Sequence, residues 1–106
     1  MKKYIINIVI LRKADGTYLA YSPDLNEAKP IPQALVISAM ELANTDPDRA
    51  PPGMFAVFKD EIMKGMITTI VDVFNAKNKA ISYLRLIGED PDRAYVCMSK
   101  IVLQCR

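Results

Sequence analysis

An eighteen-residue stretch occurs twice in this chain, and the repetition limits the folds that the chain can form. Residues 37–54 read ISAMELANTDPDRAPPGM and residues 81–98 read ISYLRLIGEDPDRAYVCM, so nine of the eighteen positions are identical. The match includes the pentapeptide DPDRA and extends into the segment before it. A repeat of this kind indicates one supersecondary unit that is used twice, at a spacing of 44 residues.

The end of each copy predicts a turn between two helices. Asn44 and Gly88 occupy equivalent positions, and both residue types readily take the left-handed conformation that follows a helix. Two residues later, Asp46 and Asp90 can each cap a new helix, and the proline after each suits the first helical position. The repeat therefore predicts an αα-hairpin that is used twice, with the Pro-Pro-Gly run at 51–53 interrupting the first copy.

An arginine follows each capping aspartate at a distance of three residues. We interpret Asp46, Arg49, Asp90 and Arg93 as structural turn residues, in which each arginine pairs with its aspartate. The alternative is a duplicated site that holds a hard cation through aspartate oxygens. Calcium loops need a longer run of alternating acidic residues with a glycine and a terminal glutamate, which DPDRA lacks. The structural interpretation is therefore favoured.

The N-terminal segment predicts a β-hairpin. Residues 4–11 (YIINIVIL) are rich in β-branched side chains, and residues 17–22 (TYLAYS) follow after a short polar connection. Asp15-Gly16 between two such runs is a turn signal, because glycine adopts a positive φ without steric cost. Residues 23–32 contain three prolines, so we expect a stiff connection there that belongs to neither neighbour.

From residue 32 onward the apolar positions follow the period of an amphipathic helix. This pattern predicts helices over 32–44, 55–75, 78–87 and 94–105. Two of the helices have an extended alternative. Residues 66–74 (MITTIVDVF) are rich in residues of low helix propensity, so a helix that ends at Lys64 and leads into a strand is the second interpretation. Residues 94–105 also suit a terminal strand.

These elements predict one α+β domain over residues 1–106, since 106 residues are the usual size of a single core. We expect an N-terminal β-hairpin followed by about four helices arranged as two αα-hairpins. The alternative is a ββα unit followed by antiparallel strands in the last forty residues.

The composition argues against catalysis. The chain has no histidine, and so lacks the commonest general base and the commonest metal ligand. It contains no Gly-rich phosphate loop, no CxxC pair and no GxSxG motif. We therefore predict a protein that is not an enzyme and that holds no cofactor or metal. A small enzyme based on carboxylates is the last of the alternatives.

The two cysteines indicate a reducing compartment. Cys97 and Cys105 are eight residues apart, which is about 12 Å along a helix or about 26 Å along a strand. A disulfide needs Cα atoms within about 7 Å, so the two cannot pair inside one regular element. Free thiols favour the cytoplasm. No apolar run is long enough to span a membrane, and we expect no membrane association.

The apolar content predicts binding to another protein. Hydrophobic residues make up 51% of the chain, more than a small core can bury, which favours an interface with a protein partner or with another copy. The expected function is a small, non-catalytic regulatory module, antitoxin-like or inhibitor-like, that acts by binding a protein partner.

Nucleic-acid binding is the main alternative function. The net charge of +2 does not indicate it, because 14 basic side chains face 12 acidic ones. A local patch would indicate it if the fold gathered the basic residues of the hairpin and of the third helix. The candidate residues are Lys2, Lys3, Arg12, Lys13, Lys77, Lys79 and Arg85.

Residues 3–45 resemble the N-terminal domain of HicB-type antitoxins. The resemblance rests on KYIINIVILRKADGTYLAYSPDLNEA, with the DG turn and the PDL of residues 23–25, followed by a helix from about Gln33. It departs where that family has a Gly-Cys and a third strand before the helix, and the repeat has no counterpart there. The resemblance implies a small regulator that blocks a toxin and that has the capacity to bind DNA.

Overall fold

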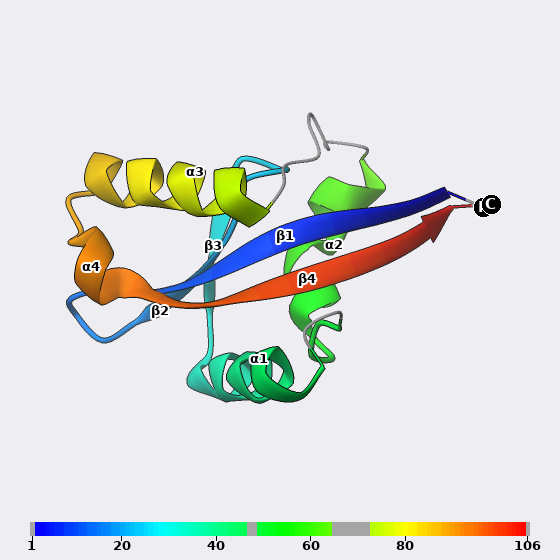
Figure 1. Cartoon of the computed structure of the whole chain (residues 1–106), viewed down its shortest axis with the longest axis horizontal. Coiled ribbons are helices and arrows are strands. Elements are labelled where there is room, and N and C mark those ends of the chain that lie inside the picture. Colours follow the sequence, from blue (N-terminus) through cyan, green and yellow to red (C-terminus); the bar gives the residue numbers. More distant parts are fainter. Residues whose placement is uncertain (1, 47–48, 65–72, 106) are drawn as a thin grey trace.

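The computed structural model describes residues 2–46, 49–64 and 73–105. Its centre is a four-stranded antiparallel sheet in the order β3-β2-β1-β4 (Figure 1). The strands are β1 (Lys2–Arg12), β2 (Tyr18–Ser22), β3 (Glu27–Ile31) and β4 (Tyr95–Cys105). β4 returns from the far end of the chain to pair along nearly the whole length of β1. The sheet therefore joins the two ends of the described chain.

The first hairpin forms as the sequence predicts. β1 and β2 pair antiparallel, and Gly16 takes the left-handed conformation in the turn between them, with φ of 89°. The Asp15 carboxylate accepts hydrogen bonds from the backbone N–H and the hydroxyl of Thr17, at 2.9 and 2.6 Å. These local bonds stabilise the turn.

A second tight turn, over Pro23 to Asn26, connects β2 to β3. Asn26 takes a positive φ of 54°, and the Ser22 hydroxyl accepts from the N–H of Leu25 at 3.2 Å. The fully buried carboxylate of Asp24 accepts from the N–H of Asn7 at 2.9 Å. Asp24 thus supplies an acceptor to β1 at the point where β2 has ended, since β2 pairs with β1 only from Val9 onward.

The prediction that residues 23–32 form a stiff connection that belongs to neither neighbour is wrong, because this segment contains β3, which pairs with β2. Pro30 lies within that strand, and its missing N–H is tolerated because β3 is at an edge of the sheet.

Helices cover both faces of the sheet (Figure 1). The helices α1 (Gln33–Thr45) and α2 (Met54–Met63) pack on one face, where Ile6, Ile8 and Ile10 meet Val36 and Phe58. The longer α3 (Val73–Leu86) and the short α4 (Pro91–Ala94) pack on the other face.

Strand β1 contributes side chains to both cores because these side chains alternate between the two faces of the sheet. Its even-numbered isoleucines enter the core under α1 and α2, whereas Val9 and Leu11 enter the core under α3. In that second core, the rings of Tyr21 and Tyr83 stack with centroids 4.7 Å apart. β1 is therefore buried on both sides, which explains its nearly continuous apolar sequence.

The predicted hairpin with two αα-hairpins is wrong. The segment 94–105, expected as a helix, is the strand β4, and the helices lie on opposite faces of a four-stranded sheet. The alternative with several strands in the last forty residues is also wrong for the part of that stretch that is described, where β4 follows two helices. Of the segment 66–74, residues 73 and 74 begin α3 and the rest lie outside the described residues.

The two copies of the repeat do not form equivalent hairpins. The first copy includes most of α1, and Asn44 lies inside that helix, which continues to Thr45. In the second copy the chain leaves α3 through Gly88, which takes the expected left-handed conformation with φ of 80°. The elements after the two copies also differ, because the first copy leads to α2 and the second leads through α4 into β4.

Several apolar side chains that the helical pattern directs inward are exposed. Met40 on α1 is 45% exposed, Met63 at the end of α2 is 72% exposed and Phe74 at the start of α3 is 73% exposed. α2 ends at Met63, before the predicted end at residue 75, whereas α1 has the predicted length and α3 begins earlier than predicted. Among the described residues, we find no helix with the length and hydropathy needed to cross a membrane.

Candidate functional site

The open edge of β4 is the most distinctive surface feature. β4 pairs with β1 on one side, and no described strand pairs with its other side. Over Lys2–Ile8, moreover, β4 is the strand partner of β1, because β2 pairs only with Val9 to Arg12. This part of the sheet is thus a two-stranded ribbon, and no strand among residues 2–46, 49–64 and 73–105 pairs with the outer edge of β4.

Strand β4 lacks most of the features that protect an exposed edge. Natural edge strands usually carry several charges, a proline or a bulge that prevents pairing with another chain. Over its eleven residues β4 has one charged side chain, Lys100, and no proline. A bulge lies only at its start, where Val96 is the extra residue between the pairs Leu11–Tyr95 and Ile10–Cys97. The stretch after Cys97 is regular.

A mainly apolar cleft of about 500 Å³ lies beside the second half of β4. Ile101, Val102 and Leu103 form one wall, and the segment from Arg49 to Gly53 together with Phe55 forms the other. Phe55, in the first turn of α2, is 39% exposed. The cleft therefore offers an apolar surface directly next to a strand edge, a combination that binds an extended chain.

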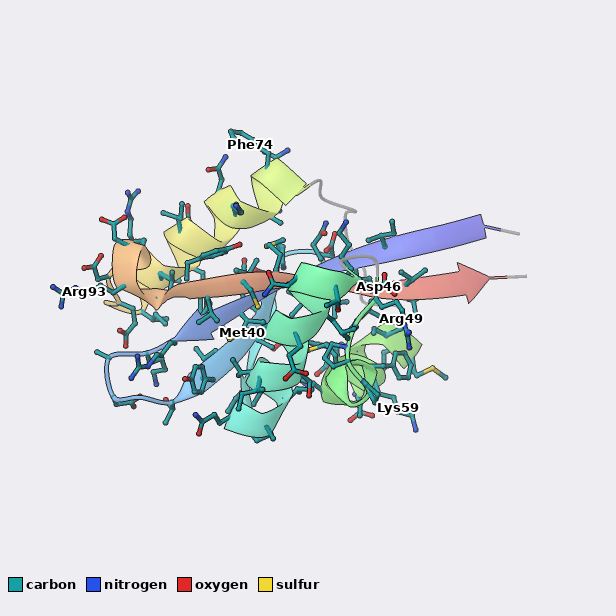
Figure 2. The ribbon with its side chains drawn as sticks, turned by 60° about the horizontal axis from the view of Figure 1, so that its bottom comes forward. Met40, Asp46, Arg49, Lys59, Phe74 and Arg93 are labelled. Atoms are coloured by element: carbon teal, nitrogen blue, oxygen red, sulfur yellow. The ribbon has the colours of Figure 1, made fainter. Side chains whose placement is uncertain are left out.

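Arg49, from the first repeat copy, lies at this cleft. Arg49 Nε is 4.0 Å from Asp46 Oδ2 and lines the cleft, and the N–H of Arg49 donates to the carbonyl of Asp46 at 3.2 Å. Figure 2 shows the two side chains together, where the chain leaves α1 for α2. No helix begins at Asp46, so the predicted helix start is wrong in this copy.

In the second copy the aspartate does start a helix. Asp90 Oδ1 accepts from the N–H of Asp92 at 3.0 Å, Pro91 is the first residue of α4, and Arg93 Nε is 3.8 Å from Asp90 Oδ2. Figure 2 shows Arg93 at the end of the molecule opposite to Arg49. The two copies thus do not form a joint site. Among the described side chains, no three potential metal ligands converge.

The fold does not gather the candidate basic residues into one patch. Lys2 and Lys3 begin β1, whereas Arg12 and Lys13 lie at its other end, about 30 Å away at the rise of a strand. On α3, Lys77 lies over the ring of Tyr95 at 5.1 Å from its centroid, and Lys79 and Arg85 are exposed.

Arg12 and Lys13 do contribute to a second hollow, of about 430 Å³, at the end of the first hairpin. Glu89, Asp90 and Arg93 also line it, so its charges are of mixed sign. The Glu89 carboxylate accepts from the N–H of Ala14 at 3.0 Å, and Asp90 caps α4. Both carboxylates therefore have structural roles, since Glu89 connects the hairpin to the turn before α4 and Asp90 caps α4.

Cys97 does not have the surroundings of a reactive thiol. It is a free, half-buried cysteine, and burial raises its pKa above the ordinary value. A higher pKa leaves less thiolate at neutral pH, which lowers the reactivity of the sulfur. This agrees with an apolar packing role.

The cleft was not among the sequence-based site predictions. The sequence predicts a helix over 94–105, which includes the strand residues that line the cleft, and it predicts that Phe55 begins a long helix over 55–75. A usable signal was present, because residues 95–105 combine β-branched residues with a single charge, and Pro-Pro-Gly stops the chain just before Phe55.

Comparisons with protein-family models, with characterised proteins and with solved structures gave no match.

Proposed function

We propose that this protein is a small, non-catalytic interaction module that binds a protein partner along the edge of β4 and in the cleft beside it. The observation that carries the proposal is the open edge of β4, which has one charge in eleven residues. Such an edge offers a row of backbone donors and acceptors to an incoming strand.

The cleft adds side-chain selectivity to this backbone contact. An extended chain that pairs with β4 directs alternate side chains to one face of the sheet, and those near Leu103 would meet Phe55 and Pro52.

A regulatory role accords with the resemblance of residues 3–45 to HicB-type antitoxins, which act by binding a toxin. The strand β3 adds support, since that family has a strand at the equivalent place, whereas the Gly-Cys is absent here. We place the protein in the cytoplasm as part of this proposal, because the free thiol of Cys97 suits a reducing compartment. The separation of the basic residues gives nucleic-acid binding less support.

Two matched substitutions test the proposal. Phe55 and Phe74 are both exposed phenylalanines in the first turn of a helix, where a glutamate is tolerated. We expect the tagged wild-type protein to capture a partner, or untagged copies of itself, from native extract. Phe55→Glu should lose that partner and Phe74→Glu should retain it. Equal capture by wild type and Phe55→Glu would show that the cleft is not the binding surface.

A further inference from the structure

The proposed function leaves the identity of the partner open, and the ribbon formed by β1 and β4 limits the choice. Over Lys2–Ile8 this ribbon has two strands, one face of which packs on Val36 and Phe58 of the helices, and its β4 edge keeps a row of backbone donors and acceptors that no described strand pairs with. A third strand on the edge of β4 would stabilise it. The partner should therefore contribute a strand of similar length and of similarly low charge.

β4 itself meets these requirements. On the basis of the proposed function, we infer that the partner is a second copy of this chain, whose β4 pairs antiparallel with the first β4 across a two-fold axis at Ile101. The two sheets then join into one continuous sheet of eight strands, four from each copy. A closed two-fold arrangement is the commonest form of protein self-association.

The axis follows from the charge and the bulge of β4. An axis at Lys100 places two lysines directly opposite each other, which is destabilising. An axis at Ser99 would include the bulge at Val96 in the paired stretch. An axis at Val102 would shorten the paired stretch, because β4 ends at Cys105. An axis at Ile101 pairs residues 97–105 with the same residues of the second copy and avoids both the bulge and the lysine pair.

This register sets the contacts near the axis. Ile101 lies opposite Ile101, Ser99 lies opposite Leu103 and Lys100 lies opposite Val102, each pair pointing to one face of the sheet. Ile101 also lines the cleft, so the clefts of the two copies adjoin the axis. Phe55, which is exposed in one copy, then approaches the apolar surface of the other.

The pair Lys100–Val102 allows a test that depends on the register. The chain mass is 11.9 kDa, so sedimentation velocity at rising concentration should show the wild-type mass approaching twice that value. Val102→Lys places lysines opposite each other at two symmetric positions and should weaken dimerisation about tenfold or more. Val102→Glu places a carboxylate opposite Lys100 and should leave dimerisation equal to wild type or stronger.

A double variant controls for the substitution itself. Lys100→Glu combined with Val102→Lys restores opposite charges across the axis and should recover the dimer that Val102→Lys loses. Circular dichroism of each variant checks that the fold is kept. Equal weakening of dimerisation by Val102→Lys and Val102→Glu would overturn the proposed register. A wild-type mass that stays at 11.9 kDa at every concentration would overturn the inference that the partner is a second copy. A monomer that still captures a different protein through Phe55 would leave the proposed function in place.

Discussion

The carboxylate of Asp24 accepts a hydrogen bond of 2.9 Å from the backbone N–H of Asn7, seventeen residues earlier in the chain. Asp24 is fully buried in the turn between β2 and β3, so its side chain takes over a position that a strand carbonyl would otherwise occupy. This hydrogen bond connects the second turn to the middle of β1, at the point where the four-stranded part of the sheet ends and the β1/β4 ribbon begins.

Removing this carboxylate should destabilise the fold. Asp24→Ala leaves the buried N–H of Asn7 without that acceptor, and we expect a loss of about 1–3 kcal/mol in the free energy of unfolding. Asp24→Asn keeps an acceptor oxygen and should cost less. Urea unfolding monitored by circular dichroism measures both values. Wild-type stability in Asp24→Ala would show that the bond has no role in the fold.

The ion pair between Lys29 on β3 and Glu61 on α2 predicts a pH-dependent contribution to stability. The hydrogen bond from Lys29 lowers the pKa of Glu61 below its ordinary value of 4.5. A carboxyl group whose pKa is lower in the folded state stabilises the protein above the unfolded pKa, and this stability is lost as pH falls through the folded value.

The difference in unfolding free energy between wild type and Glu61→Gln should therefore be largest near neutral pH and should decrease as the pH falls below the ordinary value of 4.5. Thermal unfolding over this pH range measures it. Glu41→Gln, at an exposed position on α1, is the control for the substitution itself. A difference for Glu61→Gln that does not change as the pH falls well below the ordinary value would contradict the assigned ion pair.

The equivalent positions Asn44 and Gly88 of the two repeat copies should respond differently to substitution by alanine. Gly88 has a φ of 80°, so Gly88→Ala introduces a Cβ in the left-handed conformation and should cost about 1 kcal/mol. Asn44 lies inside α1, where alanine is the better helix former, so Asn44→Ala should be neutral or stabilising by about 0.5 kcal/mol. Chemical unfolding of both variants checks this. Equal destabilisation would favour the duplicated helix end that the sequence predicts.

Alanine substitutions of two phenylalanines in α2 should differ in their effect on stability, because one side chain is in the core and the other is at the surface. Phe58 is fully buried under the sheet, and Phe58→Ala should cost about 3–5 kcal/mol. Phe55 faces the cleft, and Phe55→Ala should cost less than about 1 kcal/mol. Guanidinium unfolding gives both numbers. A large loss in Phe55→Ala would mean that this residue supports the fold and is unsuitable as a probe of binding.

The local parts of this fold could be predicted from sequence, whereas the long-range parts could not. The signal for the Asp15-Gly16 turn lies in neighbouring residues, and the first hairpin was predicted correctly. Residues 94–105 place Ala94, Cys97, Met98 and Ile101 at helical spacing, yet the pairing of Ile101 with Ile6 decides in favour of a strand. β3 was missed because Pro30 argues against a strand unless the strand lies at an edge, which the sequence does not reveal.

The same limit applies to the candidate site. The cleft depends on the contact of residues 49–55 with residues 101–103, two segments about fifty residues apart. The basic residues of the hairpin show the opposite effect. The sequence suggests that Lys2, Lys3, Arg12 and Lys13 belong to one group, but the length of β1 separates the first two from the last two. The apolar content predicts an interface without giving its location, and the position of the apolar cleft became clear only from the position of β4.

Amide hydrogen exchange of β4, measured by NMR at low and high protein concentration, tests the central claim most directly. In a single copy, alternate amides of β4 point to β1 and should exchange slowly, while the intervening ones face the open edge and should exchange quickly. The account predicts that raising the concentration slows the intervening amides between Ser99 and Leu103. Fast exchange of these amides at every concentration would contradict it, because no strand of a second copy would then occupy the edge.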